Sequence, residues 1–252
     1  MFALLLLLEL YYTQQNTYPK LPNDALVLPQ LNSSFFVLVT GGNNESIALA
    51  TAKEFDALGA SVIVTTPHLS TYNHSWLDGT NIRVLELELG RIGSGPGTVK
   101  GFWDTYYVIA GQQTRVYINS ALTIANGNPE DYTDSQLEYY YRMSVIDPLQ
   151  LEMKIIKNRD QNQPLKIGYV TTWAGISKPP YYQPLYNDKA SFFIERLHGH
   201  NSALSYPNVE YVATLCVFTN TSAMDKSVNP SAVKGNIAQV KFQATFKFAL
   251  RA

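Results

Sequence analysis

The stretch that decides the fold is Phe35–Gly42, FFVLVTGG, an unbroken apolar run that ends in two glycines. A run this short, followed by turn residues, predicts a strand that is buried on both faces. Residues 46–58 then place apolar side chains at helical spacing and stop at Gly59, and residues 61–66 form a second apolar run. Strand, glycine turn, helix and strand make one βαβ unit, whose crossover is right-handed.

The same alternation continues along the chain. It predicts further strands at residues 83–89, 115–119, 166–172 and 209–218, and helices at 99–110, 134–159 (kinked at Pro148) and 185–198. Alternating segments of this length predict an α/β fold, a doubly wound parallel sheet of the Rossmann-like type with helices on both faces, in three layers. We expect one domain over residues 35–252, preceded by an apolar segment and an extended arm over residues 1–34.

Composition excludes several classes of protein. The chain has 252 residues, a formal net charge of -1 and one cysteine, which argues against nucleic-acid binding and against a disulfide-stapled domain. The apolar segment Met1–Leu10 is too short to span a bilayer and lacks the basic start of a signal peptide. We therefore expect a cytoplasmic protein without a membrane span.

The turn after the first strand raises the question of a nucleotide. A dinucleotide fingerprint has three spaced glycines, but here Ser46 and Ala48 stand where the later two belong, and Glu45 adds a negative charge. A tight turn between strand and helix needs glycine for structural reasons as well, so both interpretations stay open. The second strand ends in Thr66-Pro67-His68 without an acid, which disfavours NAD. His68 is either a partner for a 2′-phosphate or an exposed loop histidine.

Several stretches together carry a resemblance. They are Leu38–Gly41 with Ser46 and Ile47, residues 59–66, residues 131–142, Tyr186–Ser191 and residues 218–221. In these stretches the chain resembles the short-chain dehydrogenase/reductase family, and within it most the β-ketoacyl reductase domain of fungal fatty acid synthase. The resemblance implies NADP(H) as cofactor. The residues that it implies for holding the cofactor are Gly41, Gly42, Ser46, Ile47, Thr66, His68, Asn119, Lys189 and Thr219.

The resemblance also implies a catalytic set. The family uses a tyrosine as general acid, a lysine that lowers the pKa of that tyrosine, a serine and an asparagine. Lys189 matches the family lysine, but Leu185 stands four residues before it, whereas Tyr186 and Tyr182 stand three and seven residues before it. Thr172 falls where the serine belongs, and Asp147 falls near the asparagine position.

Because these departures occur together, we expect a ketoreductase-like protein that is catalytically degenerate. It would serve as a structural or partner-binding subunit of a larger assembly linked to fatty acid synthase, with or without bound NADP(H). A protein partner or a second copy would dock through the long helix (residues 134–159) and the N-terminal segment. The alternative is an active NADPH-dependent 3-ketoacyl or carbonyl reductase that uses Tyr186 or Tyr182 with Lys189. His198-Gly199-His200 lacks further ligands nearby, so we expect no metal.

Overall fold

The computed structural model describes residues 30–43, 46–121, 132–172, 206 and 208–216. In these ranges six strands form one sheet in the order β3-β2-β1-β4-β5-β6, and all neighbouring strands are parallel. The strands are β1 (Phe36–Thr40), β2 (Ser61–Thr66), β3 (Arg83–Glu86), β4 (Thr114–Asn119), β5 (Leu165–Thr172) and β6 (Val209–Cys216). The predicted doubly wound α/β fold is therefore confirmed.

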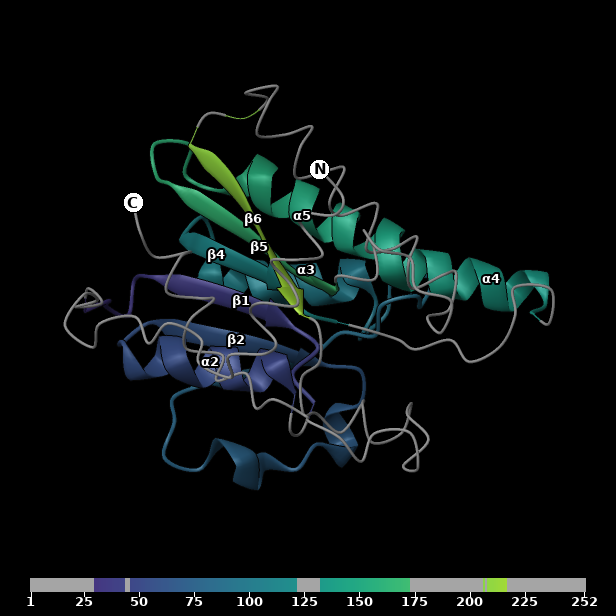
Figure 1. Ribbon diagram of the computed structural model, residues 1–252, viewed down its shortest axis with the longest axis horizontal. Helices are drawn as coiled ribbons and strands as arrows, with labels where there is room; N and C mark the ends of the chain where they lie inside the picture. The colour runs from purple at the N-terminus through teal and green to yellow at the C-terminus, as the bar shows by residue number, and fades with distance from the viewer. Residues whose placement is uncertain (1–29, 44–45, 122–131, 173–205, 207, 217–252) are drawn as a thin grey trace, which may run out of the picture.

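Helices cover both faces of the sheet and complete the three layers (Figure 1). Apolar residues of α2 (Ile47–Ala57) pack on one face, and those of α3 (Val99–Ala110) and α5 (Asp147–Asn158) form a second core on the other. Two short 3-10 helices, η1 (Leu69–Thr71) and η2 (His74–Leu77), lie between β2 and β3. The structure thus has the layer order that the sequence predicts.

Local sequence explains where α2 and α3 begin. The Ser46 hydroxyl accepts a hydrogen bond from the Leu49 amide at 3.1 Å, and Thr98 accepts one from Gly101 at 3.2 Å. Both are N-cap contacts of the kind that serine and threonine favour. In α2, Ala48, Ala52 and Phe55 are spaced so that one side of the helix is buried against the sheet.

The third strand is shorter than predicted, because it ends at Glu86 rather than at residue 89. Leu87 still donates to Thr66 and forms an isolated bridge with Gly97. The next amide, that of Glu88, bonds to the Gly97 carbonyl, and Gly90 turns the chain with a φ of +93°. The alternating side chains of this segment therefore continue beyond the strand ladder.

The helix expected over residues 134–159 is present as one continuous helical stretch that ends at Asn158, but its irregularity is a π-helical turn just before Pro148. It consists of α4 (Asp134–Tyr141), a π-helical turn (Arg142–Ile146) and α5. Pro148 has no amide hydrogen, so a regular bond to the carbonyl four residues earlier cannot form there. The helix widens into the π-helical turn just before the proline, where the Asp147 amide bonds to the carbonyl of Arg142, five residues earlier.

Two predictions concern segments outside the described residues, namely the apolar N-terminal segment and the helix at residues 185–198. Among the residues that the structure describes, no helix is long and apolar enough to cross a membrane.

Candidate functional site

The carboxyl ends of β1 and β4 meet at the point where the strand order reverses. The Thr40 hydroxyl donates to the side-chain oxygen of Asn119 at 3.0 Å, and the Ala121 amide donates to Thr40 at 3.4 Å. Thr40 and Asn119 are almost completely buried. The Asn119 amide nitrogen is also buried and has no hydrogen-bond partner in the described part of the chain. In open parallel sheets this reversal point is where ligands bind.

The glycine turn after β1 is folded tightly against its neighbours. Gly41 has a φ of +84°, and a Cβ there would lie 2.7 Å from the Ala121 backbone. A Cβ on Gly42 would lie 2.8 Å from Val64. The amides of Gly41 and Gly42 donate to the hydroxyl and the carbonyl of Thr65, at 3.4 and 2.7 Å. Packing within the protein therefore explains why both residues are glycine.

The N-terminus of α2 presents donors at the same edge of the sheet. In the first turn of a helix the amides have no acceptor within the helix, which applies here to Ile47 and Ala48. The Ser46 hydroxyl is already used as the cap, and no acidic residue occupies the first helical turn. Such helix N-termini attract phosphate groups. Glu45 lies outside the described residues.

The end of β2 carries two of the predicted cofactor residues. Thr66 is buried, and its hydroxyl donates to the side-chain oxygen of Asn43 at 3.2 Å. His68 is exposed, and its carbonyl accepts hydrogen bonds from Thr71. The structure therefore places His68 where either of its two interpretations can hold.

Asp147 occupies a buried position between two other elements. One carboxylate oxygen accepts the Gly90 amide at 2.6 Å, and the other pairs with Arg142 at 3.2 Å. Burial raises the pKa of Asp147, and the Gly90 amide and Arg142 oppose that rise. One oxygen thus joins α5 to the loop after β3, and the other joins it to the π-helical turn.

A second buried carboxylate, Glu152, was not singled out by the sequence. It accepts hydrogen bonds from the hydroxyls of Tyr169 on β5 and Tyr211 on β6, the second at 2.8 Å. Burial raises the pKa of Tyr117 on β4, the negative charge of Glu152 raises it further, and the Thr40 hydroxyl lowers it. Polar groups therefore extend between the sheet and α5, from Thr40 towards β6. The only sequence signal was the tyrosine content of the strands.

The remaining predicted residues are not brought together by the described structure. Tyr182, Tyr186, Lys189 and Thr219 lie outside the described residues, as does His198-Gly199-His200. Thr172 is the last residue of β5, and nothing is described of its side chain. Within the described ranges, no group of three His, Cys, Asp or Glu side chains is placed to hold a metal ion.

Comparison with known proteins finds similarity to solved structures only. No family model matches the chain, and neither does any curated protein. Among solved structures, it is similar to a short chain dehydrogenase from Burkholderia cenocepacia J2315 in complex with NADP, with a TM-score of 0.64 and 17% identity, covering 76% of this chain and 77% of that one. It is also similar to angucycline C-6 ketoreductase LanV with bound NADP, with a TM-score of 0.65 and 19% identity, covering 81% and 79%. A third is a short-chain dehydrogenase from Sphingobium yanoikuyae in complex with NADPH, with a TM-score of 0.65 and 16% identity, covering 81% and 79%. These likenesses show that the chain has the fold of short-chain dehydrogenase/reductases.

Proposed function

We propose that this protein is a ketoreductase-like member of the short-chain dehydrogenase/reductase family that binds NADP(H), with a degenerate catalytic centre and a role as a partner-binding subunit. The observation that carries the proposal is the junction of Thr40 and Asn119. At the reversal point of the sheet it leaves one buried donor, the Asn119 amide nitrogen, without a partner among the described residues. Similar folds are known in complex with NADP or NADPH, which supports the choice of ligand.

The residues present fit such a ligand. The first-turn amides of α2, around Ile47, would hold the diphosphate. Gly41 and Gly42 bring the backbone close to the strand ends, and Asn119 supplies a donor at the same edge. Thr66 and His68 lie on the side where the adenosine half belongs. When bound, the nicotinamide would supply hydride-transfer chemistry.

The residues around the predicted proton donor support the proposal of degenerate catalysis. A leucine stands four residues before Lys189, and Tyr186 and Tyr182 have a different spacing. In the described structure Asp147 is buried and held by Gly90 and Arg142. Catalytic groups lose about 10²-fold in rate for a misplacement of about 1 Å, so combined departures favour binding without efficient turnover.

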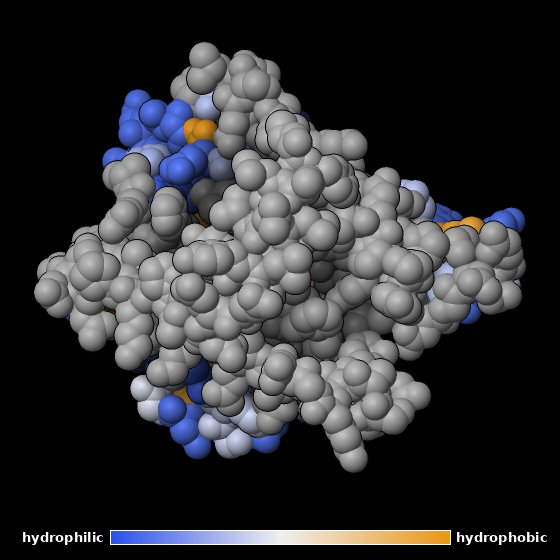
Figure 2. Space-filling model, in the orientation of Figure 1, coloured by the Kyte–Doolittle hydropathy of each residue, from blue (hydrophilic) through white to orange (hydrophobic). Residues whose placement is uncertain are grey.

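The partner surface that we propose includes α4 and the π-helical turn. None of the residues of α4 is buried, and Tyr139, Tyr141 and Ile146 are exposed large side chains. Figure 1 shows α4 extending beyond the sheet, and Figure 2 shows hydrophilic and hydrophobic residues mixed at this end of the molecule. Exposed tyrosines suit protein interfaces. A protein of the fatty acid synthase type, in the cytoplasm, is the first partner to test, and a second copy of this chain is the other.

The binding half of the proposal is tested by titrating the full chain with NADPH and following the cofactor fluorescence. We expect saturable binding that the variant Ser46→Asp weakens strongly. Aspartate still caps α2, but its charge faces the diphosphate. The matched control is Thr133→Asp, which makes the same change at the exposed N-cap of α4. If wild-type protein shows no saturable binding, the proposal is wrong.

The catalytic half is tested by single-turnover oxidation of bound NADPH with a 3-ketoacyl substrate, and native mass spectrometry tests association. Binding with no or very slow oxidation, together with an oligomer or a stable complex with fatty acid synthase, supports the proposal. Multiple rapid turnovers would instead favour the active reductase that uses Tyr186 or Tyr182 with Lys189.

A further inference from the structure

The loop after β3 holds one guanidinium between two carboxylates. Arg91 lies 3.8 Å from Glu86 and 3.5 Å from Glu88, measured between the nearest nitrogen and oxygen atoms. Glu86 is the last residue of β3 and pairs with Thr66, the last residue of β2. Neighbouring strands are about 4.8 Å apart, so Glu86 and the guanidinium that it contacts lie beside the end of β2. The three side chains are partly exposed and therefore accessible to a ligand at this edge.

The backbone that carries Arg91 is held firmly in place. The Gly90 amide bonds to Asp147 at 2.6 Å, the Arg91 amide bonds to Glu88 at 3.2 Å, and the Glu88 amide bonds to Gly97 at 2.8 Å. A Cβ on Gly97 would lie 2.7 Å from the carboxylate of Glu86 and 3.2 Å from the guanidinium of Arg91. The base of the side chain is thus fixed, whereas its charged end lies at the surface.

Lysine and arginine are scarce in the segments that follow the first three strands. Three segments follow β1, β2 and β3 along the carboxyl edge, namely residues 41–52, 67–82 and 87–98. Arg91 is the only lysine or arginine in them. The adenosine half of a dinucleotide lies over the first βαβ unit of such a sheet. A phosphate on the adenosine ribose therefore has one guanidinium within this edge to bind.

We propose that Arg91 selects NADP(H) over NAD(H) by moving from Glu86 and Glu88 to the ribose 2′-phosphate, an assignment that rests on the proposed function. Exposed ion pairs of this length contribute little to stability, so their loss costs little. A guanidinium and a phosphate form a stronger, bidentate pair. Glu86 and Glu88 oppose the phosphate, so they limit the affinity that Arg91 provides.

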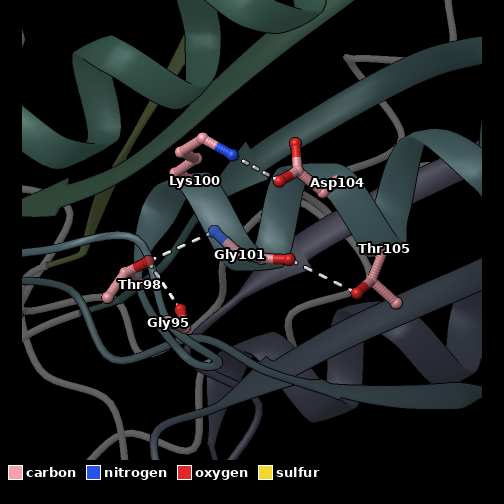
Figure 3. A network of polar contacts seen from close by, with 6 residues as sticks. All are labelled: Gly95, Thr98, Lys100, Gly101, Asp104 and Thr105. Atoms are coloured by element: carbon pink, nitrogen blue, oxygen red, sulfur yellow. Dashed lines mark hydrogen bonds and ion pairs between the residues drawn. The ribbon is translucent and has the colours of Figure 1, made fainter.

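The test compares the dissociation constants of NADPH and NADH for the full-length protein and three variants. We expect Arg91→Gln to raise the dissociation constant of NADPH about tenfold, because only NADPH carries the phosphate that pairs with arginine. The dissociation constant of NADH should change less than about twofold. Glu86→Gln should lower the dissociation constant of NADPH, because it removes a negative charge that repels the phosphate. The matched control is Lys100→Gln, which breaks the exposed pair of Lys100 and Asp104 on α3, at 2.7 Å, and should change neither constant (Figure 3).

Two results overturn the assignment and are distinguishable. Unchanged NADPH binding in Arg91→Gln, or an equal loss for both cofactors, removes Arg91 as the selecting residue while leaving the proposed function intact. If wild-type protein binds neither cofactor, the proposed function falls, and the assignment falls with it. A wild-type preference for NADH would also contradict it and would point to Glu86 as an acceptor for the ribose hydroxyls. Thermal melting of each variant confirms that it is folded.

Discussion

Thr40 and Asn119 are joined by a buried hydrogen bond of 3.0 Å, although they are 79 residues apart in the sequence. Thr40 ends β1 and Asn119 ends β4, so this bond ties together the two strands between which the sheet reverses its order. Ala121 adds a second contact to the same hydroxyl. The candidate site is therefore built on a fixed junction rather than on two independent strand ends.

Replacing Thr40 by valine should destabilise the protein. Valine has nearly the same shape but cannot donate to the Asn119 oxygen, and leaving a buried polar group unsatisfied costs about 1–3 kcal/mol. Urea unfolding followed by circular dichroism measures the loss. The control is Thr105→Val, since the Thr105 hydroxyl donates to the Gly101 carbonyl at 3.3 Å on the exposed side of α3 (Figure 3). Equal losses in the two variants would contradict the prediction.

Gly41 should not tolerate a side chain. Alanine there is strained at a φ of +84°, and its Cβ would collide with the Ala121 backbone at 2.7 Å. Backbone strain of this kind costs about 1–3 kcal/mol before the collision is added. The matched control is Gly95→Ala, because a Cβ at Gly95 meets open space and its φ is not positive. A thermal melt of Gly41→Ala that coincides with that of Gly95→Ala would show that the turn is looser than described.

Much of the fold was predictable because its signals are local. The apolar run at residues 35–40, the helix stop at Gly59 and the periodicity of residues 99–110 each fix one element from neighbouring residues. The end of β3 was misjudged because alternation continues past Glu86, whereas hydrogen bonds to Gly97 take the chain out of the ladder.

The candidate site was only partly predictable, because its main contacts join distant elements. Nothing near Glu152 in the sequence indicates that it accepts hydrogen bonds from β5 and β6, since a glutamate on a helix is usually exposed. Arg91 was missed for a similar reason: its position beside the end of β2 follows from strand order and not from spacing along the chain. The roles of Tyr182, Tyr186 and Lys189 stay predictions.

Tyr211→Phe should reveal the contribution of the buried Glu152. The variant keeps the ring and removes a hydrogen bond to a carboxylate at 2.8 Å, so we expect a loss of about 1.5–3 kcal/mol. A double-mutant cycle with Glu152→Leu, which removes the acceptor, isolates the pairwise energy. Tyr107→Phe, on the exposed side of α3, is the control and should stay within about 0.5 kcal/mol of wild type. Additive effects in the cycle would mean that the two groups do not interact.

Asp147 should make the stability of the protein depend on pH. Burial raises its pKa above the ordinary value of 3.8, so between that value and the raised one the folded state holds a proton that the unfolded state has lost. The contribution of Asp147 to the free energy of unfolding is thus fully present below pH 3.8 and is lost as the pH rises through the raised pKa. In Asp147→Asn the amide oxygen can still accept from Gly90, but nothing titrates there.

Urea unfolding at a series of pH values should therefore show wild type losing stability relative to Asp147→Asn as the pH rises from about 4 towards neutrality. Asp104→Asn, at an exposed pair on α3, gives the background of a surface carboxylate. A constant difference between wild type and Asp147→Asn across the series would mean that burial does not govern this carboxyl group.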